Sequence, residues 1–320
     1  MNILLTGAFG NIGISTLKAM AGRGHRIRCF DLPCRTNRRL ALKHASDMQV
    51  VWGDMRRIED LQRAVQDQDL VIHLAALIPE LSHTGQNSEQ HPALAQAVNV
   101  GGMRKLLQVL KAMPKPASIL FTSTLHVYGR TQQLPPPRTI DGAVNPVELY
   151  AKQKVICEQL LMDSGLQWAV FRLAAAIPVR MVFSRAMFQV PLHNRIEFVH
   201  TLDAGMALAN AVDQDLLWGK RWLIGGGAQC QLTYGDMLNQ VMALMGQAPL
   251  PAKLFSPVDY SVDWLDTLAS QQLLHYQQRT YADYVSDLQT ILGARLYWIR
   301  LCRHPIRLAL LLLSVVAKRR

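Results

Sequence analysis

The segment Leu4-Leu5-Thr6-Gly7-Ala8-Phe9-Gly10-Asn11-Ile12-Gly13 decides the fold of this 320-residue chain. Its apolar first half predicts a buried strand, and apolar residues at helical spacing over 14–20 predict a helix directly after it. Three glycines at intervals of three residues join the two elements. In this context Gly7 permits a tight turn, Gly10 lets the backbone approach a pyrophosphate, and Gly13 lets helix and strand pack closely.

An ordinary glycine-rich turn shows the same spacing, so the dinucleotide interpretation needs support elsewhere in the chain. Asp31 ends the next predicted strand, 18 residues after Gly13. An acid at about this spacing accepts hydrogen bonds from the adenosine ribose and repels a 2′-phosphate, which predicts NAD rather than NADP. Arg35, Arg38 and Arg39 follow either as a solvated surface run or as charges that weaken this preference, so NADP is not excluded.

Strands and helices alternate through the first half of the chain. This order predicts an α/β fold with a Rossmann-like, doubly wound parallel sheet. Further strands are predicted at 25–30, 49–52, 69–74, 119–121, 167–173 and 221–224. Helices are predicted at 58–65, 93–113, 146–163, 202–212, 233–245, 263–274 and 280–292, with a polar loop at 79–91.

The pattern divides the chain into three parts. Residues 1–172 are predicted to form an NAD-binding Rossmann domain, to which 197–225 return. Residues 173–196 and 226–293 are predicted to form a smaller, mostly helical substrate lobe. The remaining residues form a basic and apolar tail.

Tyr150 and Lys154 are four residues apart on the helix predicted from Pro146, so they share one face. A tyrosine hydroxyl titrates near ~10, too high for a base at neutral pH. A neighbouring cation favours the phenolate, so Lys154 is expected to lower the pKa of Tyr150 toward the working range. The hydroxyl of Thr124, at the end of the fifth strand, could hold a substrate oxygen. Taken alone, a Tyr-x-x-x-Lys pair is also typical of a solvated helix face.

Several motifs occur together in one order, and on them the sequence resembles the extended short-chain dehydrogenase/reductase family, the NAD-dependent epimerase/dehydratase group. The resemblance covers residues 1 to about 292. The motifs are Thr6-Gly7-x-x-Gly10-x-x-Gly13, Asp31, Gly53-Asp54, His73-Leu74-Ala75-Ala76, Asn99-Val100-x-Gly102, Thr122-Ser123-Thr124 before Val127-Tyr128-Gly129, Tyr150-x-x-x-Lys154 and Phe198-Val199-His200-x-x-Asp203.

The resemblance implies a role for each matching residue. Tyr150 would be the general acid/base, Lys154 would bind the nicotinamide ribose and lower the tyrosine pKa, and Thr124 would orient the substrate. Asn99 would sit at a helix kink behind the lysine. The implied cofactor-binding residues are Gly7, Phe9, Gly10, Asn11, Ile12, Gly13, Asp31, Asp54, Met55, Leu74, Ala75, Ala76, Asn99, Thr122, Tyr150 and Lys154. The implied substrate-side residues are Ser123, Thr124, Arg172 and His200.

The substrate side departs from the nucleotide-sugar epimerases of this family. Where these enzymes carry an asparagine after the sixth strand, this chain reads Arg172-Leu173-Ala174-Ala175-Ala176, and the segment that follows is short. Two arginine positions are replaced, by Ile196 (with Arg195 one step off) and by Ser256. Arginine suits bidentate phosphate binding, so a nucleoside-diphosphate substrate is disfavoured.

Composition and charge argue against a metal site, secretion and nucleic-acid binding. The five cysteines form no Cys-x-x-Cys pair and no metal-ligand spacing, which suits a reducing compartment and predicts no metal site. The N-terminus enters a strand directly, so no secretion signal is expected and the protein is predicted to be cytoplasmic. The net charge of +11 is concentrated after Asp287, and the body is too mildly basic for a nucleic-acid groove.

The tail at 294–320 lies beyond the resemblance. It holds seven cations and no acid: Arg295, Arg300, Arg303, Arg307, Lys318, Arg319 and Arg320. Its apolar run is shorter than the ~20 residues that span a bilayer, and Pro305 is expected to interrupt it. The tail is either an interfacial helix on an anionic membrane, at its cytoplasmic face, or a helix packed on the body or on a second subunit.

The sequence thus predicts an NAD-preferring oxidoreductase that transfers a hydride at a secondary alcohol or ketone carbon. A lipophilic, steroid-like substrate is suggested by analogy within the family. The alternatives are a nucleotide-sugar epimerase or dehydratase, and a dinucleotide-binding scaffold or redox sensor without turnover. The resemblance also implies a homodimer through the helices that hold Asn99 and Tyr150.

Overall fold

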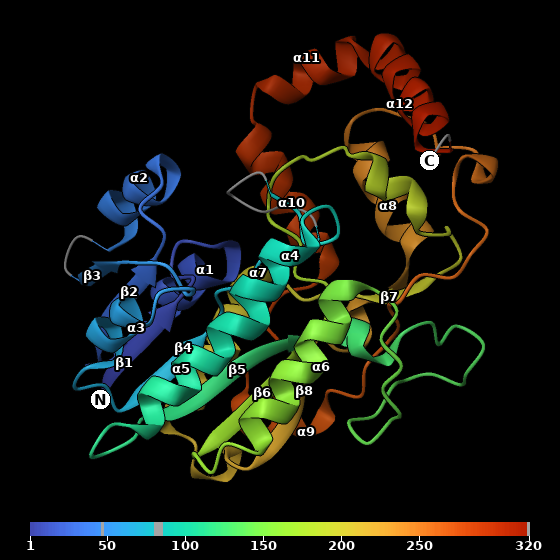
Figure 1. Cartoon of the computed structure of the whole chain (residues 1–320). Helices are drawn as coiled ribbons and strands as arrows, with labels where there is room; N and C mark the ends of the chain where they lie inside the picture. Colours follow the sequence, from blue (N-terminus) through green and yellow to red (C-terminus); the bar gives the residue numbers. More distant parts are fainter. Residues whose placement is uncertain (46–47, 80–85, 319–320) are drawn as a thin grey trace.

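A computed structural model describes residues 1–45, 48–79 and 86–318 and is built around a seven-stranded parallel sheet (Figure 1). The strand order is β3-β2-β1-β4-β5-β6-β8, which confirms the doubly wound topology. The strands are β1 (Asn2–Thr6), β2 (Arg26–Asp31), β3 (Gln49–Trp52), β4 (Leu70–His73), β5 (Ser118–Thr124), β6 (Trp168–Leu173) and β8 (Lys220–Ile224). Because β1 has β2 on one side and β4 on the other, the winding reverses at β1, where such sheets bind ligands.

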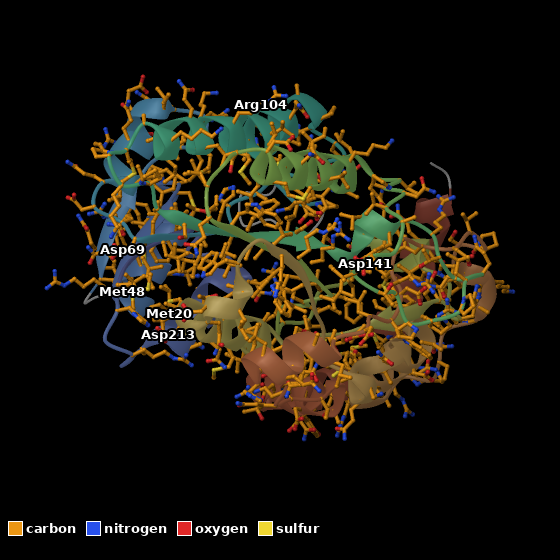
Figure 2. All side chains as sticks on the ribbon, turned by 90° about the horizontal axis from the view of Figure 1, so that it is seen from below. Met20, Met48, Asp69, Arg104, Asp141 and Asp213 are labelled. Atoms are coloured by element: carbon orange, nitrogen blue, oxygen red, sulfur yellow. The ribbon has the colours of Figure 1, made fainter. Side chains whose placement is uncertain are left out.

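Helices cover both faces of the sheet because its strands are apolar on both faces. On one face, Leu5 and Ile72 pack with α1 (Asn11–Met20) and α7 (Thr201–Asn210). On the other face, Val71 packs with three helices. These are α3 (Ile58–Val65), α5 (Gly102–Lys111) and α6 (Leu149–Met162). Figure 2 shows side chains filling both sides of the sheet, with Arg104 outside one helix layer and Asp213 on the other side.

The helix predicted at 93–113 is interrupted at the predicted kink. It begins as α4 (Pro92–Ala95), widens into the π-helical segment η1 (Gln96–Gly101) and continues as α5. Single π-helical turns inside α-helices occur frequently at functional sites. Residues 80–85 of the polar loop predicted before this helix lie outside the described residues.

The second half is mostly helical, as predicted, with a small antiparallel sheet of β7 (Arg195–Glu197) and β9 (Gln231–Thr233). Its helices are α8 (Tyr234–Leu244), α9 (Leu268–Leu274) and α10 (Tyr281–Leu292). The remaining elements outside the tail are α2 (Arg35–His44) and the 3-10 segments η2 (Leu125–Tyr128), η3 (Arg185–Gln189), η4 (Ala211–Asp213), η5 (Asp215–Leu217), η6 (Ala228–Cys230) and η7 (Ala252–Leu254).

Two predicted helix starts are wrong. The helix of Tyr150 begins at Leu149 rather than Pro146, because its cap residue Glu148 is still extended. The helix ending at Leu274 begins at Leu268 rather than Asp263, since the Asp263 carboxylate is held by arginine side chains outside the helix. In both cases residues before the helix continue its apolar spacing although their backbone is not helical.

The tail forms two helices, α11 (Arg295–Leu301) and α12 (Arg303–Lys318). Pro305 does not interrupt α12, because it occupies the first turn, where a missing N–H costs no intrahelical bond. Leu310 on α12 is 3% exposed and packs with Phe188 and Phe255, so part of the tail belongs to the core of the second half. No described helix is long and apolar enough to cross a membrane. Arg319 and Arg320 lie outside the described residues.

Candidate functional site

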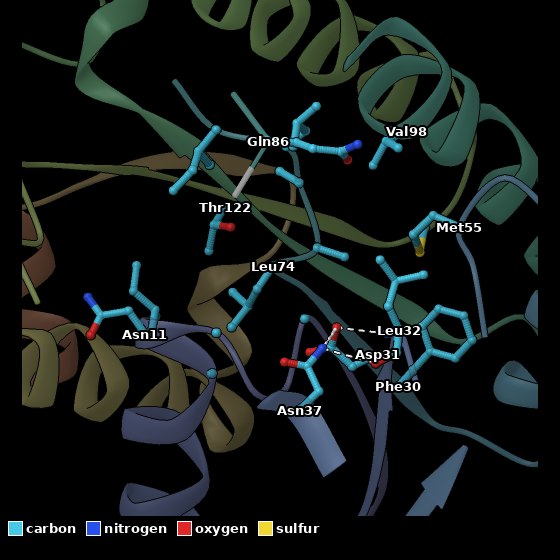
Figure 3. Close-up of a pocket in the computed structure, with 18 of the residues that line it drawn as sticks. Asn11, Phe30, Asp31, Leu32, Asn37, Met55, Leu74, Gln86, Val98 and Thr122 are labelled. Atoms are coloured by element: carbon cyan, nitrogen blue, oxygen red, sulfur yellow. Dashed lines mark hydrogen bonds between the residues drawn. The ribbon is translucent and has the colours of Figure 1, made fainter. Parts of the chain in front are cut away.

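A cleft opens where the glycine turn meets the carboxyl ends of the strands (Figure 3). Gly7 has φ +68°, and a Cβ added there would lie 2.8 Å from the backbone nitrogen of Ala75. A Cβ on Gly13 would lie 2.3 Å from the carbonyl oxygen of Gly7. Both positions therefore require glycine, as the sequence predicts. Gly10 caps α1 without a side-chain acceptor, so the first N–H groups of α1 remain available to an anion.

Asp31 lines the cleft at the end of β2 and is held in place by three donors. Its Oδ2 accepts from the backbone nitrogen of Phe9 at 3.0 Å, and its Oδ1 accepts from the nitrogen of Leu32 at 2.8 Å and from Nδ2 of Asn37 at 2.9 Å. Figure 3 shows Asn37 turned toward Asp31. Burial raises the pKa of Asp31, although the two backbone N–H groups oppose this shift.

Phe9 contributes to this site through its backbone rather than its ring. The ring is buried and lies 5.5 Å from the ring of Trp52, measured between centroids, and Phe9 is not among the residues lining the described cleft. Arg38 also faces Trp52, with its guanidinium carbon 5.4 Å from the ring centroid. Part of the arginine run after Asp31 therefore packs on the protein surface.

Asp54 and Met55 line the cleft on the β3 side. Burial would raise the pKa of Asp54, but hydrogen bonds and charge from Arg56 outweigh it and hold the pKa below its usual value. Nε of Arg56 donates to Oδ2 of Asp54 at 2.9 Å. This carboxylate is therefore ionised and fixed in direction.

Tyr150 and Lys154 reach the same cleft from α6. Nζ of Lys154 donates to the carbonyl oxygen of Thr122 at 2.6 Å and lies 5.6 Å from the ring centroid of Tyr150. Burial lowers the pKa of Lys154 to about 8. Burial also raises the pKa of Tyr150, so the expected lowering by the lysine is wrong for this structure. Desolvation disfavours the phenolate of Tyr150 and also the ammonium of Lys154.

The three hydroxyls at the end of β5 have different surroundings. Thr122 and Ser123 line the cleft, and the Ser123 hydroxyl donates to Glu158 Oε1 behind it. Thr124 is buried beside the cleft rather than among its lining residues. Its Oγ1 accepts from the backbone nitrogen of His126 at 3.3 Å, which leaves its own proton to donate.

Asn99 lies in the π-helical segment and does not line the cleft. Its Nδ2 donates to the carbonyl oxygen of Leu77 at 3.0 Å and to Oε1 of Gln153 at 2.7 Å, and its Oδ1 accepts from the nitrogen of Leu77 at 2.7 Å. Asn99 thus ties the cleft-lining residue Leu77 to α6, beside Lys154. It positions the site rather than forming its surface.

Arg172 and His200 do not reach the described cleft, contrary to the roles expected for them. Arg172 is 1% exposed and pairs with Glu158, with 2.7 Å between its NH2 nitrogen and Glu158 Oε2. Nδ1 of His200 accepts from the nitrogen of Leu202, and its Nε2 lies 3.3 Å from Oδ2 of Asp287. Both side chains are buried polar groups of the core. The spacing of residues in the sequence cannot distinguish such a side chain from one that lines a binding site.

The remaining predicted residues line the cleft, which brings them together from distant parts of the chain. They are Gly7, Gly10, Asn11, Ile12, Gly13, Leu74, Ala75 and Ala76. The structure adds apolar residues that no motif indicated: Ile78, Leu94, Val98, Leu173 and Pro178. Among the described residues no cluster of three His, Cys, Asp or Glu side chains could hold a metal ion.

Glu89 is a further residue that the motifs did not indicate. Its Oε1 accepts from the backbone nitrogen of Tyr150 at 3.0 Å, and its Oε2 accepts from that of Leu149 at 3.1 Å. A carboxylate here complements the positive end of α6, where N–H groups have no partner within the helix. Glu89 thereby fixes the start of the helix that carries Tyr150.

Comparison with known proteins places these features in a family. The model of the NAD dependent epimerase/dehydratase family matches residues 3–182, more than half of the chain. D-erythronate dehydrogenase of Cupriavidus necator is 33% identical over 171 residues, which are 51% of this chain and 50% of that protein. UDP-glucose 4-epimerase of Rhizobium meliloti is 31% identical over 172 residues, 52% of this chain and 47% of that protein.

Solved structures share the fold across nearly the whole chain. The UDP-glucuronic acid 4-epimerase of Bacillus cereus, in complex with UDP-glucuronic acid and NAD, superposes with a TM-score of 0.73 at 20% identity, covering 91% of this chain and 100% of that one. In sequence, the chain spans about half the length of the curated relatives it matches. On the family match and the glycine turn, this chain belongs to the NAD dependent epimerase/dehydratase family.

Proposed function

We propose that this protein is an NAD-preferring oxidoreductase that transfers a hydride at a secondary alcohol or ketone carbon. The observation that carries the proposal is one cleft that is lined both by the glycine turn and by Tyr150, Lys154 and Ser123. A scaffold or redox sensor without turnover would not need this acid/base pair beside a dinucleotide turn.

The residues present fit a dinucleotide. The α1 N-terminus and the crowded backbone at Gly7 and Gly13 would hold the pyrophosphate, and Asp31 would accept from the adenosine ribose. The bound nicotinamide supplies the hydride acceptor or donor. The chain would supply proton transfer at the Tyr150 hydroxyl, with Lys154 beside it.

The apolar part of the cleft lining is the basis for proposing an apolar substrate. Ile78, Leu94, Val98 and Pro178 are aliphatic, and apolar lining with a few polar groups suits binding of a small apolar molecule. The test is mass spectrometry of small molecules released from the denatured, purified protein, followed by NADH formation with each candidate alcohol. Turnover of a lipophilic secondary alcohol supports the proposal; turnover confined to charged sugars contradicts it.

Cofactor titration is expected to show tighter binding of NADH than of NADPH. The Asp31 carboxylate is fixed in the cleft, and a 2′-phosphate would meet its charge. Arg38 packs on Trp52 rather than facing Asp31. Fluorescence titration of both cofactors measures the ratio, and Asp31→Asn should reduce it. Equal binding by the wild type would mean that the neighbouring arginines dominate.

An epimerase or dehydratase acting on a nucleotide sugar is the second candidate, because nucleotide-sugar enzymes are among the relatives. We expect weak binding of UDP, TDP and GDP. Arg195 is neutralised by Asp263, with 2.7 Å between Nε and Oδ1, while Ile196 is buried and Ser256 bonds its own loop. Calorimetry with the three nucleotides tests this, and low-micromolar dissociation constants would promote the epimerase candidate.

The organisation of the chain completes the proposal. Residues 1–172 with 197–225 would form the dinucleotide domain, and 173–196 with 226–293 would form the substrate lobe.

A homodimer through α5 and α6 is supported by exposed Ile156 on α6. A cytoplasmic location is supported by five free cysteines. The tail would contact the inner face of an anionic membrane, supported by its uncompensated arginines.

A further inference from the structure

One face of the two tail helices is apolar and exposed to solvent. It consists of Tyr297, Trp298 and Leu301 on α11 and Leu308 and Leu312 on α12, called here the tail ridge. The exposed fractions of these five side chains run from 59% to 68%. Such a cluster of large apolar side chains on adjoining helices marks an interaction surface.

The opposite face of the same helices is fixed to the protein. Leu310 and Ser314 are buried, and Ile299, Ile306 and Leu313 pack on the cluster that contains Phe188, Leu238, Met242, Met245, Leu250 and Phe255. The tail ridge is therefore presented by packed helices rather than by a free terminal segment. In Figure 1 these helices lie at the upper right, far from the N-terminus and from α2.

The same two helices carry four arginines that have no acidic partner among the described side chains. Nε of Arg300 donates to the carbonyl oxygen of Leu244 at 3.0 Å, and NH1 of Arg307 donates to that of Ala248 at 2.8 Å. Arg295 and Arg303 are exposed. Among described side chains none of the four arginines forms an ion pair with a carboxylate. Carbonyl groups orient these cations but leave their charge uncompensated.

We infer that the tail ridge docks on an anionic lipid bilayer. Trp298 and Tyr297 are the side chains that favour the headgroup boundary, and the leucines would enter the acyl region beneath it. Arg295 and Arg303, which are exposed, would pair with lipid phosphate. This inference rests on the membrane contact proposed above and specifies the residues that make it.

A second copy of the chain fits this surface less well. A twofold interface places the same patch of both subunits face to face, so the cationic tail helices of one subunit would meet those of the other. Like charges across an interface are unfavourable, and interface cores are depleted in charge. An anionic membrane provides both an apolar interior for the leucines and negative charge for the arginines.

The test is co-sedimentation of the full chain with vesicles of phosphatidylcholine, alone or mixed with phosphatidylglycerol. Binding to the mixed vesicles only is expected, and high salt should weaken it. Arg295→Gln with Arg303→Gln should weaken partitioning about fivefold per arginine, from ~1 kcal/mol per basic residue. Trp298→Ser with Leu301→Ser should abolish binding to the mixed vesicles.

Matched controls come from exposed positions elsewhere. Leu42→Ser on α2 removes a leucine that is 82% exposed, and Lys18→Gln with Lys43→Gln removes two exposed cations. Both controls should bind vesicles as the wild type does. If the tail-ridge variants also bind as the wild type does, docking through the tail ridge is wrong.

Two further readouts separate this inference from its alternatives. Light scattering gives the mass: a dimer that Leu301→Ser dissociates, with no vesicle binding, would assign the tail ridge to a second copy and overturn the inference. NADH titration of each variant monitors the cleft. A protein that binds NADH and ignores vesicles overturns docking alone, whereas one that docks without binding NADH overturns the oxidoreductase proposal alone.

Discussion

Replacing Tyr150 by phenylalanine is expected to lower kcat by roughly 10²–10⁴-fold and to leave the affinity for NADH nearly unchanged. The phenylalanine ring can still pack in the lining of the cleft, while the only group lost is the hydroxyl that carries the proton. Steady-state kinetics on the substrate found by mass spectrometry, with NADH titration in parallel, measures both effects.

Tyr297→Phe is the matched control, because Tyr297 is exposed on α11 and lies outside the cleft. In the absence of vesicles it should leave kcat unchanged. If Tyr150→Phe turns over at a rate close to that of the wild type, the acid/base role belongs to another residue. A parallel loss of NADH affinity would instead indicate that the cleft itself has been disturbed.

Local patterns in the sequence predict which residues meet at the glycine-turn end of the cleft. The three glycines and Asp31 all lie within the first 31 residues, and the strand–turn–helix context fixes their geometry directly. The steric demands at Gly7 and Gly13 follow from that turn. Tyr150 and Lys154 could be placed in the cleft because they share one face of one helix.

Properties that depend on burial could not be predicted in the same way. A sequence shows that Lys154 lies near Tyr150, but not that both are desolvated strongly enough to shift both pKa values against ionisation. Arg172 and Glu158 are 14 residues apart and meet only after β6 and α6 pack together. A buried arginine therefore resembles a substrate ligand until its partner is known.

The hydrogen bonds of two further polar side chains were equally hidden. Glu89 caps the helix of Tyr150 from a segment 60 residues away, and Asn37 reaches back to Asp31 from α2. The tail illustrates a different limit. Its sequence suggested either membrane contact or packing on the body, whereas Leu310 packs and Leu308 is exposed on the same helix.

Replacing Arg172 by alanine is expected to destabilise the protein by about 3–5 kcal/mol, because removing one partner leaves a buried charge without compensation. Glu158 is fully enclosed, and its Oε1 also accepts from Nε of Arg172 at 3.1 Å. The loss would also leave the hydroxyl of Tyr128 without its 2.9 Å contact to the guanidinium. Urea unfolding of the full chain, compared with the wild type, measures the difference.

Arg63→Ala is the control that separates the effect of burying the arginine from the effect of losing an ion pair. Arg63 contacts Asp60 at 2.8 Å, close to the 2.7 Å of the buried pair, but its side chain is mostly exposed. Asp60 is buried but keeps the backbone nitrogen of Asp54 and the side chain of Arg57 as partners, so this variant should unfold nearly as the wild type does. Replacing Arg172 and Glu158 together by leucine should recover part of the loss, since no buried charge then remains. If Arg172→Ala proves no more destabilising than Arg63→Ala, the buried pair does not stabilise the junction between β6 and α6.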